Sequence, residues 1–278
     1  SARRKEGSTM ILIKGGRLVL PEAIISADIL VKGGKIARIG RVIPASGASV
    51  MNAAGLFVLP GAIDPHVHFR DPENTSKEDF STGSSSALAG GVTTVMDMPN
   101  YRNPPTTSIA AYNEKRRIVA KKARCDYQLR FGASEKNFEE AAASGAPSLK
   151  IFLSDTASEL FCSKEAAVQH FRHFPREKPV CVHAEDKERI AERSGKFKHQ
   201  AKVQDKLVSQ IACEFALREA GRLDRRVHIC HVTTGLEIEM CRRYPKATYE
   251  ITPNHLFLST SDLKQLGGLG RINPPLRD

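Results

Sequence analysis

The chain carries the sequence DPHVHFRD at residues 64–71, directly after the apolar stretch GLFVLPGAI at residues 55–63. Because side chains alternate along a strand, His66 and His68 are expected on one face, where both imidazoles can bind one metal ion. Arg70 follows on the same side, and its guanidinium suits bidentate capture of a carboxylate. Together these residues predict a catalytic metal site with an anion clamp. A lone His-x-His pair would equally suit a surface strand, so the hypothesis depends on further ligands.

After residue 55 the sequence alternates between strand, loop and helix patterns. The expected strands are 56–63, 92–98, 126–132, 148–153, 179–183, 226–231 and 247–252, and the expected helices include 108–123, 135–144, 163–174, 205–220 and 235–244. Ser134 and Ser163 are the expected N-caps of two of these helices. Repeated βα units predict a parallel sheet in an α/β fold. A (β/α)8 barrel of the TIM type needs eight units, whereas seven strands precede Asp278. Either the last barrel unit is missing from this chain or the sheet is not a full barrel.

Residues 10–55 have a different pattern. Short alternating runs are split by Gly15-Gly16 and Gly33-Gly34, which predicts the hairpins of a small β domain. We therefore expect three parts: a polar tail or expression remnant at 1–9, a small β domain at 10–55, and a barrel catalytic domain at 56–278 that is incomplete at its C-terminus.

The amino-acid composition limits the classes of protein to which the chain can belong. Of the 278 residues 41% are hydrophobic, which is enough for a core, and no apolar run is long enough to cross a membrane. The first nine residues lack the apolar stretch of a secretory signal. The six cysteines show no paired spacing, which favours reduced thiols and a cytoplasmic location. The net charge of +11 would suit nucleic acid, but the basic residues are dispersed and there is no tryptophan to stack bases. We therefore expect neither nucleic acid nor a membrane as a partner, and solvated helix faces explain the charge better.

Further ligand candidates lie where the expected strands end, as the active site of a barrel requires. Lys150 is flanked by large apolar residues, and a buried lysine is costly unless its charge is paired or removed. Carbamylation by CO2 would turn it into a carboxylate that bridges two metals, and a snorkelling lysine or a buried ion pair is the alternative. His183 and His231 end two later strands. Four histidines with this lysine suit a pair of Zn²⁺ ions, although other divalent metals fit the same ligands.

Other residues near these strand ends are less specific. His228 lies three residues before His231 and is therefore expected on the opposite face, as a packed or surface histidine. Asn100 follows strand 92–98 and can both donate and accept, yet alone it would be a plain turn asparagine. The sequence RINPPLR at 271–277 is expected to form a stiff, extended loop at the next strand end.

These segments resemble the dihydroorotases of the cyclic amidohydrolase superfamily. The matching strings are PGAIDPHVHFRDP, GGVTTVMDMPN, LKIFLSDTASEL, VHAE, HICHVTT, TPNHLFLS and INPPLRD, and they run from about Leu56 to the chain end. The string LKIFLSDTASEL at 149–160 is most similar to the variety with a carbamylated lysine, as in the animal multifunctional pyrimidine enzyme.

The resemblance implies a metal role for five residues. His66 and His68 would bind the first Zn²⁺ ion. Lys150, carbamylated by CO2, would bridge both ions. His183 and His231 would hold the second ion. The animal enzyme has a third zinc site as well, and the two residues that match its ligands here are Cys230 and Glu250.

The resemblance also implies how a substrate would be held. Arg70 and Asn100 would bind the substrate carboxylate, and Asn273 would line the pyrimidine pocket. Thr156 would lie in a mobile flap. The family's catalytic aspartate, on the eighth barrel strand, would fall past Asp278, so we expect a truncated chain without its general base.

The activity that the resemblance implies is the reversible closure of N-carbamoyl-L-aspartate to dihydroorotate in pyrimidine synthesis. One alternative is a hydantoinase or allantoinase, whose substrates lack the ring carboxylate that Arg70 would bind. Another is a non-catalytic dihydroorotase-like scaffold, which the intact set of five metal ligands disfavours. Dihydroorotase-like subunits can support a partner transcarbamoylase, so the assemblies to consider are a homodimer and an association with aspartate transcarbamoylase.

Overall fold

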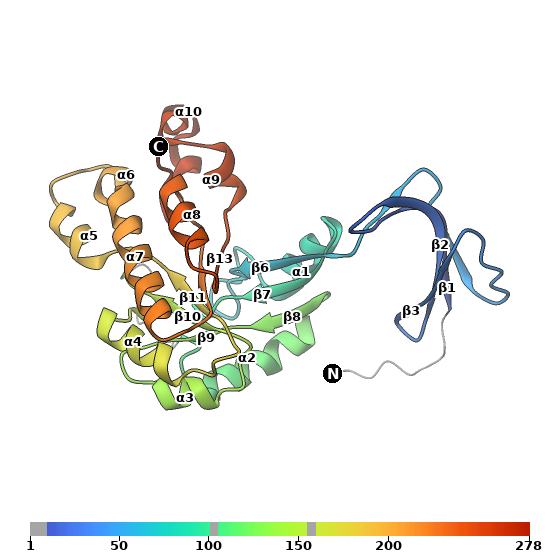
Figure 1. The fold of residues 1–278 in the computed structure, drawn as a ribbon, viewed down its shortest axis with the longest axis horizontal. Coiled ribbons are helices and arrows are strands. Elements are labelled where there is room, and N and C mark those ends of the chain that lie inside the picture. The colour runs from blue at the N-terminus through green and yellow to red at the C-terminus, as the bar shows by residue number, and fades with distance from the viewer. Residues whose placement is uncertain (1–9, 101–104, 155–159) are drawn as a thin grey trace. The chain divides into compact units, whose positions relative to one another are not determined.

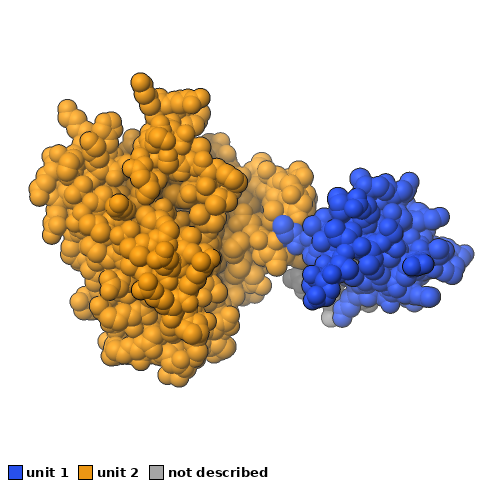
Figure 2. Space-filling model, turned by 45° about the horizontal axis from the view of Figure 1, so that its top comes forward, with its two compact units in different colours: residues 1–62 blue, residues 63–278 orange. Residues whose placement is uncertain are grey.

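The structure is a computed structural model that describes residues 10–100, 105–154 and 160–278. The chain divides into two compact units, Ser1–Ala62 and Ile63–Asp278, which Figure 2 draws in blue and orange. This boundary lies seven residues later than the sequence pattern suggests, because Phe57–Val58 still pairs with the first strand of the small unit.

The small unit is a five-stranded sheet. Its strands are β1 (Ile11–Val19), β2 (Ile24–Lys32), β3 (Lys35–Gly40), β4 (Ser49–Asn52) and β5 (Phe57–Val58). The order is β3-β2-β1-β4, and β5 also pairs with β1. Leu18, Ala27 and Ile29 form its buried cluster, as the alternation of apolar and polar residues predicts.

The two glycine pairs of this unit have different roles. Gly33 and Gly34 both have positive φ and join β2 to β3, which is the backbone that a two-residue hairpin turn requires. The prediction of a turn at Gly15-Gly16 is wrong. This pair lies inside β1, at a shift of register against β2, where the Gly15 amide donates to Asp28 Oδ1 at 2.8 Å.

The unit Ile63–Asp278 has the α/β fold of a TIM-type barrel, with helices on the outer side of the strands (Figure 1). Its strands are β6 (Ala62–Val67), β7 (Val92–Asp97), β8 (Asp126–Leu129), β9 (Phe131–Gly132), β10 (Leu149–Phe152), β11 (Val180–His183), β12 (Val227–Ile229) and β13 (Ala247–Tyr249). They form two sheets, β6-β7-β8 and β13-β12-β11-β10-β9. Among the described residues these sheets do not join into a closed barrel.

Helices follow most of the strands. They are α1 (Phe80–Ala89), α2 (Ile109–Lys122), α3 (Phe138–Ala143), α4 (Lys164–His173), α5 (Lys187–Arg193), α6 (Gln200–Val203), α7 (Lys206–Arg222), α8 (Gly235–Arg242), α9 (Pro253–Phe257) and α10 (Leu263–Leu266), with 3-10 turns at Thr260–Asp262 and Gly267–Gly270. None of the helices in the described part of the chain is both long and apolar enough to span a bilayer.

Several predicted boundaries differ from the structure, and the expected strand 126–132 is divided into β8 and β9. The expected strand 56–63 is divided, because Pro60 cannot donate to a ladder: β5 pairs with β1, and β6 begins at Ala62. Ser163 caps α4 as predicted, since its Oγ accepts from the Ala166 amide. Ser134 is not a cap, and the helix after it begins only at Phe138.

Candidate metal centre and substrate cavity

A cavity of about 670 Å³ lies where the barrel strands end. Its walls come from the ends of β6, β7, β10, β11, β12 and β13 and from the loop before the C-terminus. The predicted site residues that line it are His66, His68, Arg70, Asn100, Lys150, His183, His231, Glu250 and Asn273. The predicted flap residue Thr156 lies outside the described residues. Residues up to 209 positions apart in the chain, from Asp64 to Asn273, therefore meet in one cavity.

His66 and His68 face each other across the end of β6. Their Nε2 atoms are 3.1 Å apart. The Nδ1 of His68 lies 2.8 Å from Asn100 Oδ1, and the Nδ1 of His66 contacts the Glu250 carboxylate. Since both of these oxygens are acceptors, each Nδ1 carries the proton and each Nε2 presents its lone pair.

His183 and His231 form a second pair on the neighbouring strands. His183 Nδ1 lies 3.0 Å from His231 Nε2, and His183 Nε2 lies 2.9 Å from Glu185 Oε2. The carboxylate of Glu185 makes Nε2 the protonated nitrogen, so Nδ1 presents its lone pair to the cavity. The two pairs adjoin, because the ring centroids of His66 and His231 are 5.3 Å apart.

These nitrogen positions fit bound metal. Two lone pairs that face each other at 3.1 Å repel unless a cation lies between them. Nitrogens bound to one tetrahedral zinc ion, with bonds of about 2.0–2.1 Å, stand roughly 3.3 Å apart. In addition, each of His66, His68 and His183 has its other ring nitrogen on an oxygen acceptor, as metal-bound histidines usually do.

Lys150 lies on β10 between these two pairs and is fully buried. Its Nζ donates to Cys230 Sγ at 2.9 Å and lies 4.9 Å from the centre of the Phe152 ring. Among the described residues no carboxylate pairs with it. Burying an ammonium group with only a thiol as acceptor is costly in free energy.

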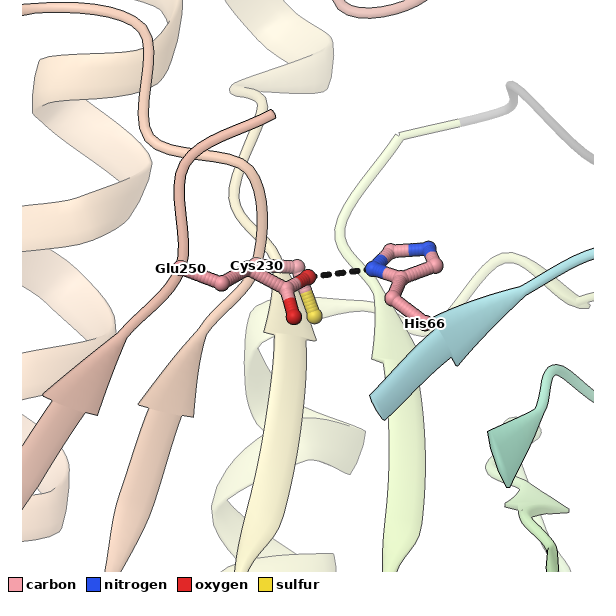
Figure 3. A group of neighbouring side chains, drawn as sticks. All are labelled: His66, Cys230 and Glu250. Atoms are coloured by element: carbon pink, nitrogen blue, oxygen red, sulfur yellow. Dashed lines mark hydrogen bonds and ion pairs between the residues drawn. The ribbon is translucent and has the colours of Figure 1, made fainter. Parts of the chain in front are cut away.

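Cys230 and Glu250, predicted as ligands of a third metal, also come together, and His66, which was not predicted there, joins them. His66, Cys230 and Glu250 each offer one ligand atom, and these atoms lie within 4.8 Å of one another (Figure 3). His228 does not line this cavity, but it lies beside Glu250. It is half-buried, and its Nε2 lies 3.2 Å from Glu250 Oε2, because Glu250 follows β13, the strand that pairs with β12.

Three polar residues line the part of the cavity beside the histidines. Arg70 and Asn100 follow β6 and β7, and Asn273 comes from the C-terminal loop. Asn273 Oδ1 accepts from Gln204 Nε2 at 3.1 Å, which leaves its own amide group as a donor. Asn100 Oδ1 is similarly occupied by His68, so its amide group is also a donor.

The sequence did not predict the network behind His183. Glu185 is fully buried, and its Oε1 accepts from Arg277 Nη2 at 2.7 Å. Gln204 Nε2 donates to Glu185 Oε2 at 2.9 Å, in addition to its contact with Asn273. The strings VHAE and INPPLRD contain both charged residues, but nothing in either string indicates that they pair. The network connects His183 with the residue expected in the substrate pocket.

Backbone strain marks the same cavity. Arg70 has a φ of 52° and His231 a φ of 35°, and Asp224 is the one other non-glycine residue with positive φ in the described part of the chain. Such conformations cost roughly 1–3 kcal/mol and persist where the surrounding structure holds them, often at functional sites.

Burial keeps the imidazoles neutral. It lowers the pKa of His66 to about 4, although the hydrogen bond with Glu250 opposes the shift. Burial lowers the pKa values of His68 and His231 well below the usual value. For His183 the direction is the same, with Glu185 opposing. The neutral imidazole is the form that binds metal, so the site is ready for it near neutral pH.

These pKa shifts predict how the metal-free protein responds to acid. Between pH 6.5 and about 4 the unfolded chain binds a proton at His66 that the folded chain does not, so the free energy of unfolding should fall as the pH falls. From His66 alone the loss is roughly 3 kcal/mol. Urea unfolding of chelator-treated protein across this pH range measures it. His66→Gln should give a shallower dependence, and an equally steep one would contradict the assignment.

Known proteins resemble this chain along most of its length. The model of the amidohydrolase family matches residues 57–246. The chain is 32% identical over 288 residues to the dihydroorotase of Methanosarcina acetivorans, covering 96% of this chain and 62% of that protein. It is 36% identical over 234 residues to multifunctional protein CAD of Squalus acanthias, covering 81% of this chain and 9% of that protein.

A solved structure agrees with this similarity. The L-hydantoinase (dihydropyrimidinase) from Arthrobacter aurescens superposes with a TM-score of 0.88 at 27% identity, over 96% of this chain and 64% of that one. The chain thus spans less than two thirds of the length of the archaeal dihydroorotase and of the hydantoinase. Since the family model covers more than half of the sequence, the chain belongs to the amidohydrolase family.

Proposed function

We propose that this chain carries the site of a dihydroorotase, which interconverts N-carbamoyl-L-aspartate and dihydroorotate through a binuclear zinc centre. One observation carries the proposal: a cluster of metal-facing imidazoles and an arginine suited to a carboxylate line the same cavity. The similarity to dihydroorotases supports the same reaction.

The residues of the chain divide into two metal-binding groups. His66 and His68 would hold one ion and His183 and His231 the other, with Lys150, as its carbamate, between them. Bound metal supplies Lewis-acid polarisation of the amide carbonyl and a water molecule with a lowered pKa. In carbamylation, the neutral amine of Lys150 forms an N–C bond with CO2 and releases one proton to water.

The polar residues beside the histidines would hold the substrate. The guanidinium of Arg70 and the amide group of Asn100 can donate to the carboxylate on the ring of dihydroorotate. The amide group of Asn273 can donate to a ring carbonyl. Because these donors are placed by the same strand ends as the metal ligands, they would orient the scissile amide toward the metals.

A third metal would take Cys230 and Glu250 as ligands, whereas the neighbouring His66 directs its Nδ1 proton to Glu250 and its Nε2 to the first ion. Hydrogen bonds from His228 and His66 outweigh the effect of burial and lower the pKa of Glu250, so it is ionised. Burial raises the pKa of Cys230 to about 12, so this thiol would bind metal only with loss of its proton. The homodimer and the association with aspartate transcarbamoylase stay predictions.

The alternative function is that of a hydantoinase, which the similar solved structure favours. The same imidazoles and lysine would serve both reactions, since both open a cyclic amide. The substrate carboxylate distinguishes them, because a hydantoin ring carries none, and Arg70 beside the metal ligands favours dihydroorotate.

A metal-loading assay tests the proposed function. Protein purified without chelator should contain about two zinc ions per chain, or three if the third group is filled, and should open dihydroorotate faster than hydantoin or dihydrouracil. Chelation should remove activity toward every substrate, and added zinc should restore it. Elemental analysis and a spectrophotometric ring-opening assay supply the measurements.

Two results would count against the proposal. Faster turnover of hydantoin than of dihydroorotate would support the hydantoinase alternative. Folded protein that binds no metal would instead support the non-catalytic scaffold, whatever substrate is offered.

A further inference from the structure

Arg130 lies at the junction between the two sheets of the barrel unit. β8 ends at Leu129 and belongs to the sheet β6-β7-β8, whereas β9 begins at Phe131 and belongs to the sheet that runs to β13. The Arg130 amide donates to Asp97 O of β7 at 3.0 Å. Its side chain is almost fully buried, at 3% exposure.

The guanidinium of Arg130 connects the two sheets. Nη2 donates to Pro65 O of β6 at 2.8 Å. Nη1 donates to Ser148 Oγ, just before β10, at 2.7 Å and contacts Cys181 Sγ of β11. One planar group thus holds one strand of the first sheet and two strands of the second.

Each of these contacts lies next to a proposed metal ligand. Pro65 directly precedes His66 in β6. Ser148 stands two residues before Lys150, and Cys181 two residues before His183. Because strand side chains repeat with period two, Ser148 and Lys150 point to the same face, as do Cys181 and His183. The guanidinium therefore lies one layer below the candidate metal centre.

Stability does not explain this arginine. No carboxylate pairs with Arg130 in the described part of the chain, and its Nε has no hydrogen-bond partner there. Burying a cation without an acidic partner costs free energy, and apolar side chains of similar volume often stabilise such positions more.

We propose that Arg130 is a positioning residue that sets the distance between the His66/His68 pair on one sheet and Lys150 on the other. This inference rests on the proposed two-metal site. The first ion would need ligands from both sheets. The second would be held by Lys150, His183 and His231, which come from adjacent hydrogen-bonded strands whose spacing the ladder itself maintains.

The proposal predicts an unequal effect on the two metals. In Arg130→Met, one zinc ion should bind with its wild-type affinity, and the other should bind about 10–100-fold more weakly, the range seen when groups that orient ligands are lost. Competition with a chromophoric chelator measures both affinities, and elemental analysis after dialysis should show a fall from about two zinc ions toward one. The kcat for dihydroorotate should fall more than its KM rises.

Two further variants control the test. Ser148→Ala removes one acceptor on the second sheet but leaves the contacts of Arg130 with Pro65 and Cys181, which still connect the two sheets, so both zinc affinities should stay close to those of the wild type. Arg130→Lys keeps the charge but cannot reach both sheets, so it should weaken the same single ion. If Arg130→Met does not fold, the comparison of Arg130→Lys with the wild type decides.

The outcomes separate the possibilities. Equal, wild-type affinities for both ions in the arginine variants would overturn the positioning role, and so would a parallel fall of both affinities together with the melting temperature. Wild-type protein that does not bind two zinc ions would overturn the proposed function itself, before any variant is compared.

Discussion

Replacing Lys150 with alanine should release metal from both halves of the site and remove nearly all activity. Lys150 is the one proposed ligand that both ions share, so its loss should cost several kcal/mol of transition-state stabilisation, or roughly 1,000-fold or more in turnover. Zinc per chain and the rate of dihydroorotate opening measure the effect. Short carboxylic acids such as acetate, bound in the space left by the side chain, should restore part of both.

Lys115 provides a matched control for this experiment. It is also buried, at 2% exposure, but its Nζ pairs with Asp97 and donates to Met98 O at 2.9 Å. Lys115→Ala should lower the free energy of unfolding by about 3–5 kcal/mol, because it leaves the buried Asp97 without its cationic partner. Added carboxylic acids should not change the zinc content of this variant. If Lys150→Ala kept both ions, or if acetate acted equally on both variants, Lys150 would not be the bridging ligand.

The contrast between the two lysines also shows what a sequence can predict. Both are buried, and the sequence identified Lys150 because large apolar residues flank it on a strand, whereas Lys115 stands between Glu114 and Arg116. Whether a buried charge is balanced depends on side chains from other elements. Asp97 reaches Lys115 from β7, across 18 positions of the chain, whereas within residues 10–100, 105–154 and 160–278 no carboxylate reaches Lys150.

Regular periodicity explains the parts of the fold that were predicted well. Strands β10 and β11 are buried on both faces and therefore appear as short apolar runs between turns. The helix α1 was missed because its sequence, FSTGSSSALA, has weak helix propensity. A capping box at Asp79 and Thr82 begins it, and its Gly83 lets the ring of Phe69 approach so closely that a β-carbon would stand 2.6 Å away.

The same distinction holds for the candidate site. The shared face of His66 and His68 follows from period two, and the structure brings their Nε2 atoms within 3.1 Å. The pairing of Glu185 with Arg277 spans 92 positions, and the contact of Arg130 with Pro65 spans 65. Such contacts depend on how strand ends and loops approach each other in three dimensions, which no local pattern encodes.

Replacing Arg70 with methionine should cut the turnover of dihydroorotate steeply while leaving the zinc content unchanged. Arg70 follows His68 by two residues, and the structure places it in the lining of the same cavity. Loss of a charge-assisted, bidentate contact with the substrate carboxylate should cost on the order of 2–4 kcal/mol in transition-state binding, or roughly 30–1,000-fold in kcat/KM. Parallel assays on dihydroorotate and on neutral cyclic amides measure it.

The neutral substrates make the result specific. Hydantoin and dihydrouracil carry no carboxylate, so their turnover, if detectable, should change little in Arg70→Met. Arg271 lines the same cavity and gives a matched control: if Arg271→Met caused the larger loss on dihydroorotate, the carboxylate clamp would be Arg271. An equal loss on charged and neutral substrates would mean that Arg70 acts on the shape of the site, because only a contact with the carboxylate can distinguish the two classes of substrate.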